Sequence, residues 1–250
     1  EQICNSAGVY ASIYALGYEH ERDLDRTALF AYRLKVLGLD VVRPLFLYLA
    51  DPDEGQIPQA ELDKCLEIIE SWLVRRMLAR VTSKSYNKII PEIISKVRED
   101  REHAATVLEN YFKTQQANTA YWPDDDEVRK ELTGLEFYDK IYRSRVRMVL
   151  ESLEDDARGW KDGKTSSSGM RIKKGSYTIE HLMPQKWQKH WPLTDGVNEL
   201  ERDSLVQSLG NLTLLSTKLN SSVSNGPWLG DEGKSAALTE HDVLLLNKRV

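Results

Sequence analysis

Residues 177–223 carry the pattern that most restricts the fold of this 250-residue chain. The stretch from Tyr177 to Ile179 alternates β-prone residues, which predicts a short strand. That strand delivers Glu180 and His181 side by side at its end. Pro184 follows and prevents the strand from continuing. The end of this first strand is therefore a place where an imidazole and a carboxylate leave the backbone as neighbours.

A second strand and a helix follow in the same segment. Residues 212–215 read Leu-Thr-Leu-Leu and predict a strand, with Asn211 at its entrance. Residues 216–223 predict a helix that begins at Ser216 or Thr217 and carries Asn220. The expected order is strand, long loop, strand and helix, and it adds two carboxamides to the imidazole and the carboxylate.

These residue types fit one kind of chemistry. A neutral His181 can take a proton from water near neutral pH. The oxygens of Glu180 and Asn220 are hard ligands suited to Mg²⁺ or Mn²⁺, with coordination positions left for a phosphate oxygen and water. Asn211 could orient the imidazole through its other ring nitrogen or through the adjacent backbone. A base beside an oxygen-ligated cation is sufficient to hydrolyse a phosphodiester.

At these residues the sequence resembles the HNH, or His-Me finger, nucleases of the ββα-metal class. The match is to the form in which an acidic residue precedes the histidine, a proline follows three positions later, and the last histidine is replaced by asparagine. More narrowly, residues 179–185 and 209–215 are similar to the C-terminal nuclease domain of GmrSD-type modification-dependent restriction enzymes, a group that includes phosphorothioate-sensing anti-phage nucleases. The resemblance implies a metal ligand at Glu180, a general base at His181, a base-orienting residue at Asn211 and a second metal ligand at Asn220.

Several further positions are weaker candidates. The family usually places a lysine soon after an aromatic residue that follows the last asparagine; here Trp228 precedes Lys234 with an insert between them. Asn225 is an alternative to Asn220 as a metal ligand. His190 is a candidate metal ligand or phosphate contact, although a surface histidine is the simpler interpretation. The candidate contacts to the DNA backbone are Lys173, Lys174, Lys186, Lys218 and Lys234. For Lys173 and Lys174, the alternative is that they only keep a loop solvated.

The rest of the chain predicts helices. Apolar residues recur at helical spacing over 58–77, 86–97 and 102–114, and a long helix is expected from 135 to about 156. A Gly/Ser-rich stretch, residues 159–169, interrupts this pattern. We therefore expect a mainly α protein: a helical domain over 1–160, and a small ββα-metal nuclease domain over 161–250 that ends in a helix over 235–248.

Composition narrows the setting. The net charge is −5, but residues 165–250 carry ten basic and nine acidic residues, so the acidity lies in the helical region. No apolar run reaches the ~20 residues needed to cross a bilayer, and no signal peptide is visible. The cysteines, Cys4 and Cys65, form no C-x-x-C pair, which favours a reducing cytoplasm and argues against a zinc knuckle. A start at Glu1 rather than methionine is expected of a part of a longer protein.

The function that these observations favour is a divalent-metal-dependent DNA endonuclease that nicks or cleaves phage or foreign DNA. The resemblance implies a partner, an N-terminal sensor and NTPase domain of the full-length protein. The alternative is a non-catalytic module for nucleic-acid binding or oligomerisation that keeps the ββα scaffold. The oligomeric state is open, because two nicking sites would require two copies to sever a duplex.

Overall fold

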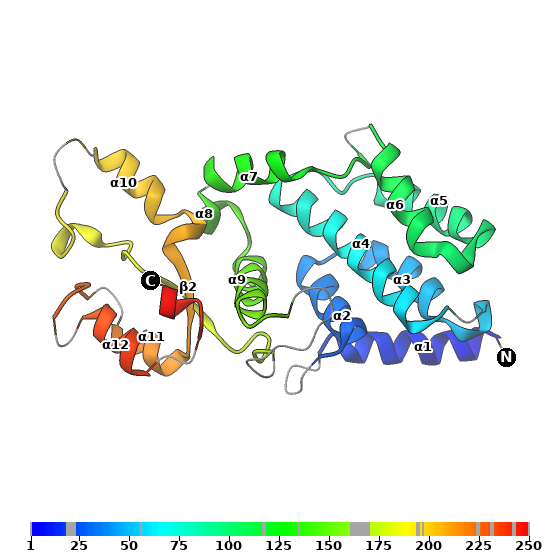
Figure 1. The fold of residues 1–250 in the computed structure, drawn as a ribbon, viewed down its shortest axis with the longest axis horizontal. Helices are drawn as coiled ribbons and strands as arrows, with labels where there is room; N and C mark the ends of the chain where they lie inside the picture. The colour runs from blue at the N-terminus through cyan, green and yellow to red at the C-terminus, as the bar shows by residue number, and fades with distance from the viewer. Residues whose placement is uncertain are drawn as a thin grey trace. The chain divides into compact units, whose positions relative to one another are not determined.

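The structure of the chain is a computed structural model that describes residues 2–18, 24–55, 57–116, 119–134, 136–160, 171–193, 196, 198–223, 226–230, 233–241 and 244–249. Over these residues the chain is mainly helical and has one two-stranded sheet, as the sequence predicts (Figure 1). The chain divides into two compact units, one of residues 24–131 with the N-terminal helix and the other centred on residues 132–250. None of the described helices is long and apolar enough to span a membrane.

The first unit is built from packed helices. Helix α4 packs against both α2 and α6, while α1 packs against α2 and α3. The helices predicted over 58–77, 86–97 and 102–114 are confirmed to within about a turn, and α5 continues through Pro91. The elements are α1 (Gln2–Leu16), α2 (Arg26–Leu37), η1 (Asp40–Val42), α3 (Arg43–Ala50), η2 (Pro52–Glu54), α4 (Gln59–Leu78), α5 (Tyr86–Glu99), η3 (Arg101–His103), α6 (Ala104–Thr114) and most of α7 (Asp125–Gly134).

Aromatic rings fill the core of the first unit around α4. The ring of Trp72 stacks on Phe112 with centroids 4.4 Å apart, and its centroid lies 4.7 Å from that of Tyr86. Trp72 is fully buried, and its indole nitrogen donates a hydrogen bond to the carbonyl of Ala120 at 2.9 Å. Arg76 is equally buried and donates to the Tyr86 hydroxyl at 2.9 Å. A buried guanidinium is tolerated here because backbone carbonyls also accept its hydrogen bonds.

The second unit contains the sheet. Strands β1 and β2 pair antiparallel, and α11 follows β2 directly, so the predicted order of strand, loop, strand and helix is present. A small apolar cluster of Leu215, Leu219, Val223 and Leu238 joins β2, α11 and α12. The elements are α8 (Phe137–Lys140), α9 (Arg143–Ala157), β1 (Thr178–His181), η4 (Trp187–Lys189), α10 (Glu199–Val206), η5 (Leu209–Asn211), β2 (Leu212–Leu215), α11 (Thr217–Val223), α12 (Lys234–His241) and η6 (Asn247–Arg249).

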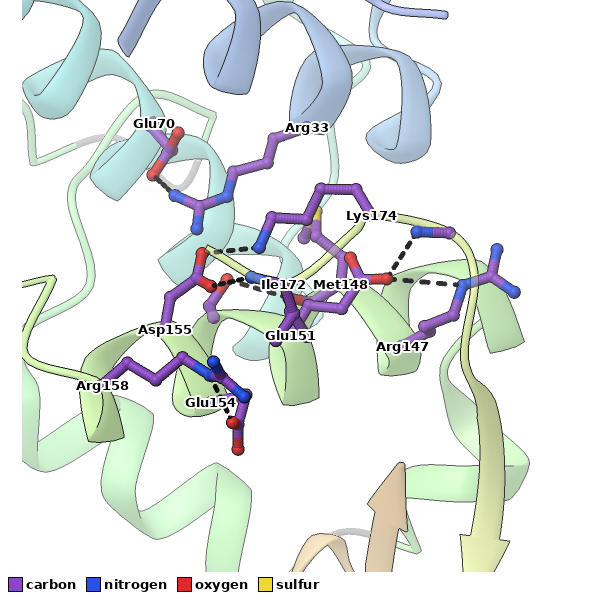
Figure 2. A network of polar contacts seen from close by, with 12 residues as sticks. Arg33, Glu70, Arg147, Met148, Glu151, Glu154, Asp155, Arg158, Ile172 and Lys174 are labelled. Carbon is purple, nitrogen blue, oxygen red and sulfur yellow. Dashed lines mark hydrogen bonds and ion pairs between the residues drawn. The ribbon is translucent and has the colours of Figure 1, made fainter. Parts of the chain in front are cut away.

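Helix α9 binds the C-terminal part of this unit through Glu154, which is fully buried. The carboxylate accepts hydrogen bonds from the backbone N–H groups of Leu245 at 3.0 Å and Leu246 at 2.8 Å. Arg158, one turn further along α9, donates to the same carboxylate at 2.6 Å (Figure 2). The buried charge is thus paired and hydrogen-bonded, the condition under which a protein interior accepts it.

Two more carboxylates of α9 hold the segment that leads into β1. Asp155 accepts a hydrogen bond from the ammonium of Lys174 at 2.5 Å (Figure 2). Glu151 accepts one from the backbone N–H of Gly175 at 2.7 Å. Helix α9 also packs against both strands. These contacts explain why residues 132–160 belong to the second unit, whereas the sequence places them in a helical domain that ends at 160. The Gly/Ser-rich stretch on which that boundary rested lies mainly outside the described residues.

Two predicted helices are shorter than expected. The helix expected over 135–156 is divided into α8 and α9, because Ile141 and Tyr142 adopt extended backbone conformations between them; its first residue, 135, is not among those described. The helix expected over 235–248 ends at His241. Beyond it, Asn247 accepts a hydrogen bond from Thr213 and donates one to the Leu214 carbonyl at 2.9 Å. This attachment to β2 competes with a continuous helix.

Candidate active site

The pairing of β1 with β2 places Glu180 opposite Thr213, and His181 opposite Leu212, at the end of the sheet. Successive side chains of a strand point to opposite faces. Accordingly, Glu180 contacts α12, whereas His181 contacts α8. The two predicted residues are therefore consecutive at one end of the strand, but their side chains contact different neighbours.

His181 lies in a largely closed environment and is 6% exposed. Its ring packs edge-on against Tyr138 with centroids 4.4 Å apart, and the Gln185 side chain lies 3.4 Å from its Nε2. Burial, aided by the positive charges of Lys234 and Arg143, lowers the pKa of His181 to about 4. The imidazole is consequently neutral at pH 7 and can accept a proton.

The side chain of Asn211 holds the loop that follows His181. Its Oδ1 accepts a hydrogen bond from the Met183 N–H at 2.8 Å, and its Nδ2 donates to the Met183 carbonyl at 2.9 Å. The backbone carbonyl of Asn211 accepts a hydrogen bond from the Leu182 N–H at 2.9 Å. Of the two routes left open by the sequence, these contacts follow the backbone route: Asn211 acts on the peptide groups beside the histidine.

Glu180 forms an ion pair with Lys234. The ammonium of Lys234, which is 1% exposed, lies 2.5 Å from Glu180 Oε1 and 2.6 Å from the backbone carbonyl of His181. Burial raises the pKa of Glu180, while the hydrogen bond and charge of Lys234 oppose that rise. A cation is therefore held on the carboxylate that the sequence assigns to a metal.

Asn220 lies on the same face of β1 as Glu180. Its Nδ2 donates to Thr178 Oγ1 at 2.9 Å, and Thr178 precedes Glu180 by two residues in the strand. Residues two apart in a strand share a face. The carboxylate of Glu180 and the carboxamide of Asn220 thus belong to one side of β1, as the expected ligand pair requires.

The family model of the GmrSD restriction endonucleases, C-terminal domain, matches residues 122–250. The chain belongs to this family. No curated protein and no solved structure matches the chain. The matched range begins close to the start of the second unit and includes α8 and α9.

The lysines expected to contact DNA differ in exposure within this GmrSD C-terminal domain. Lys173, Lys186 and Lys218 are exposed. Lys174 and Lys234 are instead bound to the carboxylates of Asp155 and Glu180. An internal carboxylate already neutralises each of these two, so they are less suited to a phosphate backbone than the exposed lysines are.

The alternative ligands receive no added support. Asn225 lies outside the described residues. His190 is exposed and follows the 3-10 turn η4, where its backbone N–H donates to the Trp187 carbonyl at 3.1 Å. The described residues contain no group of three or more His, Cys, Asp or Glu side chains suited to a metal ion.

The sequence did not indicate the residues that surround His181. Tyr138 contacts the imidazole and is covered by the guanidinium of Arg143, 3.3 Å from its ring centroid. Gln207 favours the protonated imidazole, although its buried Oε1 has no hydrogen-bond partner among the described residues. Tyr138 and Gln207 are also joined by a backbone hydrogen bond of 2.9 Å. Since these residues act through tertiary contacts, no local spacing in one sequence would reveal them.

Proposed function

We propose that this domain is a divalent-metal-dependent endonuclease of the HNH type that hydrolyses phosphodiester bonds of DNA. Membership of the GmrSD restriction endonucleases supports a nuclease acting on DNA. The observation that carries the proposal further is the end of β1, where a neutral imidazole and a carboxylate stand on consecutive residues whose backbone is held by Asn211 and Lys234.

His181 is the proposed general base. Its low pKa keeps it unprotonated at the pH of the cell, so it can take a proton from an attacking water. The nitrogen assigned to this task is Nε2, because the exposed Gln185 is the group that lies beside it. Asn211 fixes the backbone from which the imidazole projects, and Tyr138 restricts the rotation of the ring.

Glu180 and Asn220 are the proposed ligands for Mg²⁺ or Mn²⁺. Their oxygens are of the type that these ions prefer, and both side chains belong to one face of β1. The bound ammonium of Lys234 supports the choice of Glu180, because it shows that a cation is stable on this carboxylate. When bound, the metal would supply charge stabilisation at the leaving oxygen of the phosphodiester.

The proposal also covers how the domain contacts DNA and what the N-terminal domain of the full-length protein contributes. The exposed lysines Lys173, Lys186 and Lys218 would contact the phosphate backbone, which carries no sequence information. The full-length protein would supply modification sensing and nucleotide hydrolysis through its N-terminal domain, and the activity would act in anti-phage defence. Specificity would accordingly come from that domain, in line with recognition of modifications such as phosphorothioate.

A nicking assay on supercoiled plasmid with Mg²⁺ or Mn²⁺ tests the proposal. We expect His181→Ala to lose about 100- to 10,000-fold in rate, the usual contribution of a general base. Asn220→Ala should also lose cleavage, and added metal should restore part of it, because a weakened ligand set can be saturated. The matched control is His103→Ala, which removes an exposed histidine of the first unit.

The same assay separates the proposal from the alternative of a non-catalytic module. Cleavage that persists at the parental rate in both site variants would refute the assigned site. A parent protein that binds DNA in a gel shift but never nicks it under either metal would favour a scaffold without catalysis.

A further inference from the structure

The peptide group between His181 and Leu182 is held at both of its ends. Its carbonyl oxygen accepts a hydrogen bond from Lys234 Nζ at 2.6 Å. Its N–H donates to the backbone carbonyl of Asn211 at 2.9 Å. A peptide group with both polar atoms bound cannot rotate without breaking one of these contacts. The backbone immediately after the proposed base therefore has a fixed orientation.

Lys234 makes a second contact from the same ammonium. It binds Glu180 Oε1 at 2.5 Å, so one nitrogen joins the side chain of the proposed metal ligand to the main chain of the proposed base. The lysine comes from α12 and is 1% exposed. Burying an ammonium this completely is costly unless it is paired, and here its two oxygen partners offset that cost.

The conformation of the preceding loop also fixes Lys234. The backbone N–H of Lys234 donates to the Pro227 carbonyl at 2.9 Å, and the Ser235 N–H donates to the Trp228 carbonyl at 3.1 Å. A Cβ atom added at Gly233 would lie 2.6 Å from the Trp228 carbonyl oxygen, closer than real Cβ atoms approach. The chain approaches itself at Gly233 in a way that only glycine permits, and this approach places the start of α12 beside β1.

We propose that Lys234 is the positioning residue of this active site: its ammonium sets the direction of Glu180 and of the His181 backbone together, and it competes with the divalent cation for Glu180 Oε1. This inference rests on the proposed function for its catalytic consequence. It replaces a phosphate contact, for which a buried and ion-paired lysine is unsuited. It also links the side chain of Glu180 to the main chain of His181 through one residue.

The proposal predicts opposite changes in metal affinity and in cleavage. In Lys234→Met the ammonium is lost while a side chain of similar length remains. Mn²⁺ should then bind about threefold or more tightly, because a positive charge that repels the dication is gone and Oε1 is released. Cleavage at saturating metal should nevertheless fall by about tenfold or more, because Glu180 and the His181 backbone lose their common partner. Neither a general loss of structure nor the loss of a ligand gives this combination.

The experiment compares four proteins: the parent, Lys234→Met, Lys234→Arg and the control Lys248→Met, which changes an exposed lysine of η6. Mn²⁺ affinity is measured by electron paramagnetic resonance at about pH 8, where exposed carboxylates are ionised. Cleavage is measured on supercoiled plasmid, and amide hydrogen exchange is followed at Leu182. We expect faster exchange at Leu182 in Lys234→Met only, and partial rescue of cleavage in Lys234→Arg.

Each outcome bears on the proposal. If Lys234→Met loses Mn²⁺ affinity and cleavage together, or cleaves like the parent, Lys234 does not position the site. If Lys234→Met does not fold, the double variant Lys234→Met with Glu180→Gln removes both charges of the pair and should recover folding. Amide exchange at Leu182 that is as slow in this double variant as in the parent would also refute the proposal. A parent that neither binds Mn²⁺ nor cleaves refutes the proposed function, whereas Leu182 exchange still decides whether Lys234 holds the backbone.

Discussion

In the first unit the largest buried side chains are mostly aromatic rings, whereas in the second unit many buried side chains are charged or otherwise polar. The first set includes Phe30, Phe46, Trp72, Tyr86 and Phe112, and the second includes Glu151, Glu154, Asp155, His181, Thr213, Lys234 and Asn247. Burial of apolar surface is non-directional and tolerates repacking, while buried hydrogen bonds require one geometry. The second unit thus uses directional contacts where the candidate site needs fixed positions.

The largest effect that we expect on stability follows from removing the central ring of the first unit. Trp72→Ala deletes a fully buried indole that stacks on Phe112, and it should lower the free energy of unfolding by about 3–5 kcal/mol. Urea unfolding followed by circular dichroism measures the change. Trp72→Phe is the matched control: it keeps an aromatic ring beside Phe112, loses the hydrogen bond to Ala120 and part of the buried ring, and should cost less, about 1–3 kcal/mol.

This substitution also examines the comparison itself. If the two units are stabilised separately, amide exchange in β2 should change less than exchange in α4. If amide exchange accelerated equally in both elements, the two units would not be stabilised separately. The contrast between their cores would then not explain their stability.

The next effect concerns the polar core of the second unit. Glu154→Gln preserves size but removes the charge that accepts hydrogen bonds from Leu245, Leu246 and Arg158. We expect a loss of about 1–3 kcal/mol, since a carboxamide nitrogen cannot accept hydrogen bonds from these donors. The matched control is Glu109→Gln, which breaks an exposed pair with Lys113 one turn away and should leave unfolding unchanged within error. Equal stability of the two variants would contradict a structural role for the polar core.

The sequence predicted the elements of the site better than their contacts. Both strands and α11 follow from local alternation, a turn and a capping residue, which act over a few positions. The division between α8 and α9 could not be predicted in the same way, because residues 135–156 keep a helical pattern across Ile141 and Tyr142. In the structure α8 ends at Lys140, and the hydrogen bond from Tyr138 N–H to the Gln207 carbonyl ties its first turn to a distant part of the chain.

The candidate residues show the same limit. The role of Asn211 stays a prediction, and the structure adds that its contacts are with the backbone of Leu182 and Met183. Lys234 lies beside the motif residues, as expected, but its ammonium contacts Glu180 in the structure. A lysine near a nuclease motif suggests a contact with the phosphate backbone of DNA. Only the tertiary fold reveals that Glu180 neutralises this lysine. The sequence around Lys234 does not reveal whether a lysine that follows such a glycine-rich turn is exposed or buried.

The last effect that we predict is a pH dependence of stability that originates at His181. Burial lowers its pKa in the folded protein to about 4, whereas an unfolded histidine has a pKa of about 6.5. Between these values the unfolded chain binds a proton that the folded protein does not. The contribution of His181 to stability is therefore fully present above about pH 6.5 and is lost as the pH falls through 4.

Urea unfolding of the metal-free protein across this window tests the sign. The parent should lose more stability between neutral and acidic pH than His181→Gln, which has no proton to gain, while the two should follow parallel curves above the window. The difference between the two curves isolates this residue, because every other ionisable group is the same in both proteins. Parallel curves throughout would mean that the imidazole is as accessible to protons when folded as when unfolded. The closed environment formed by Tyr138 and Gln207 would then be excluded, and with it the contrast between an enclosed base and an ion-paired Glu180 on opposite faces of β1.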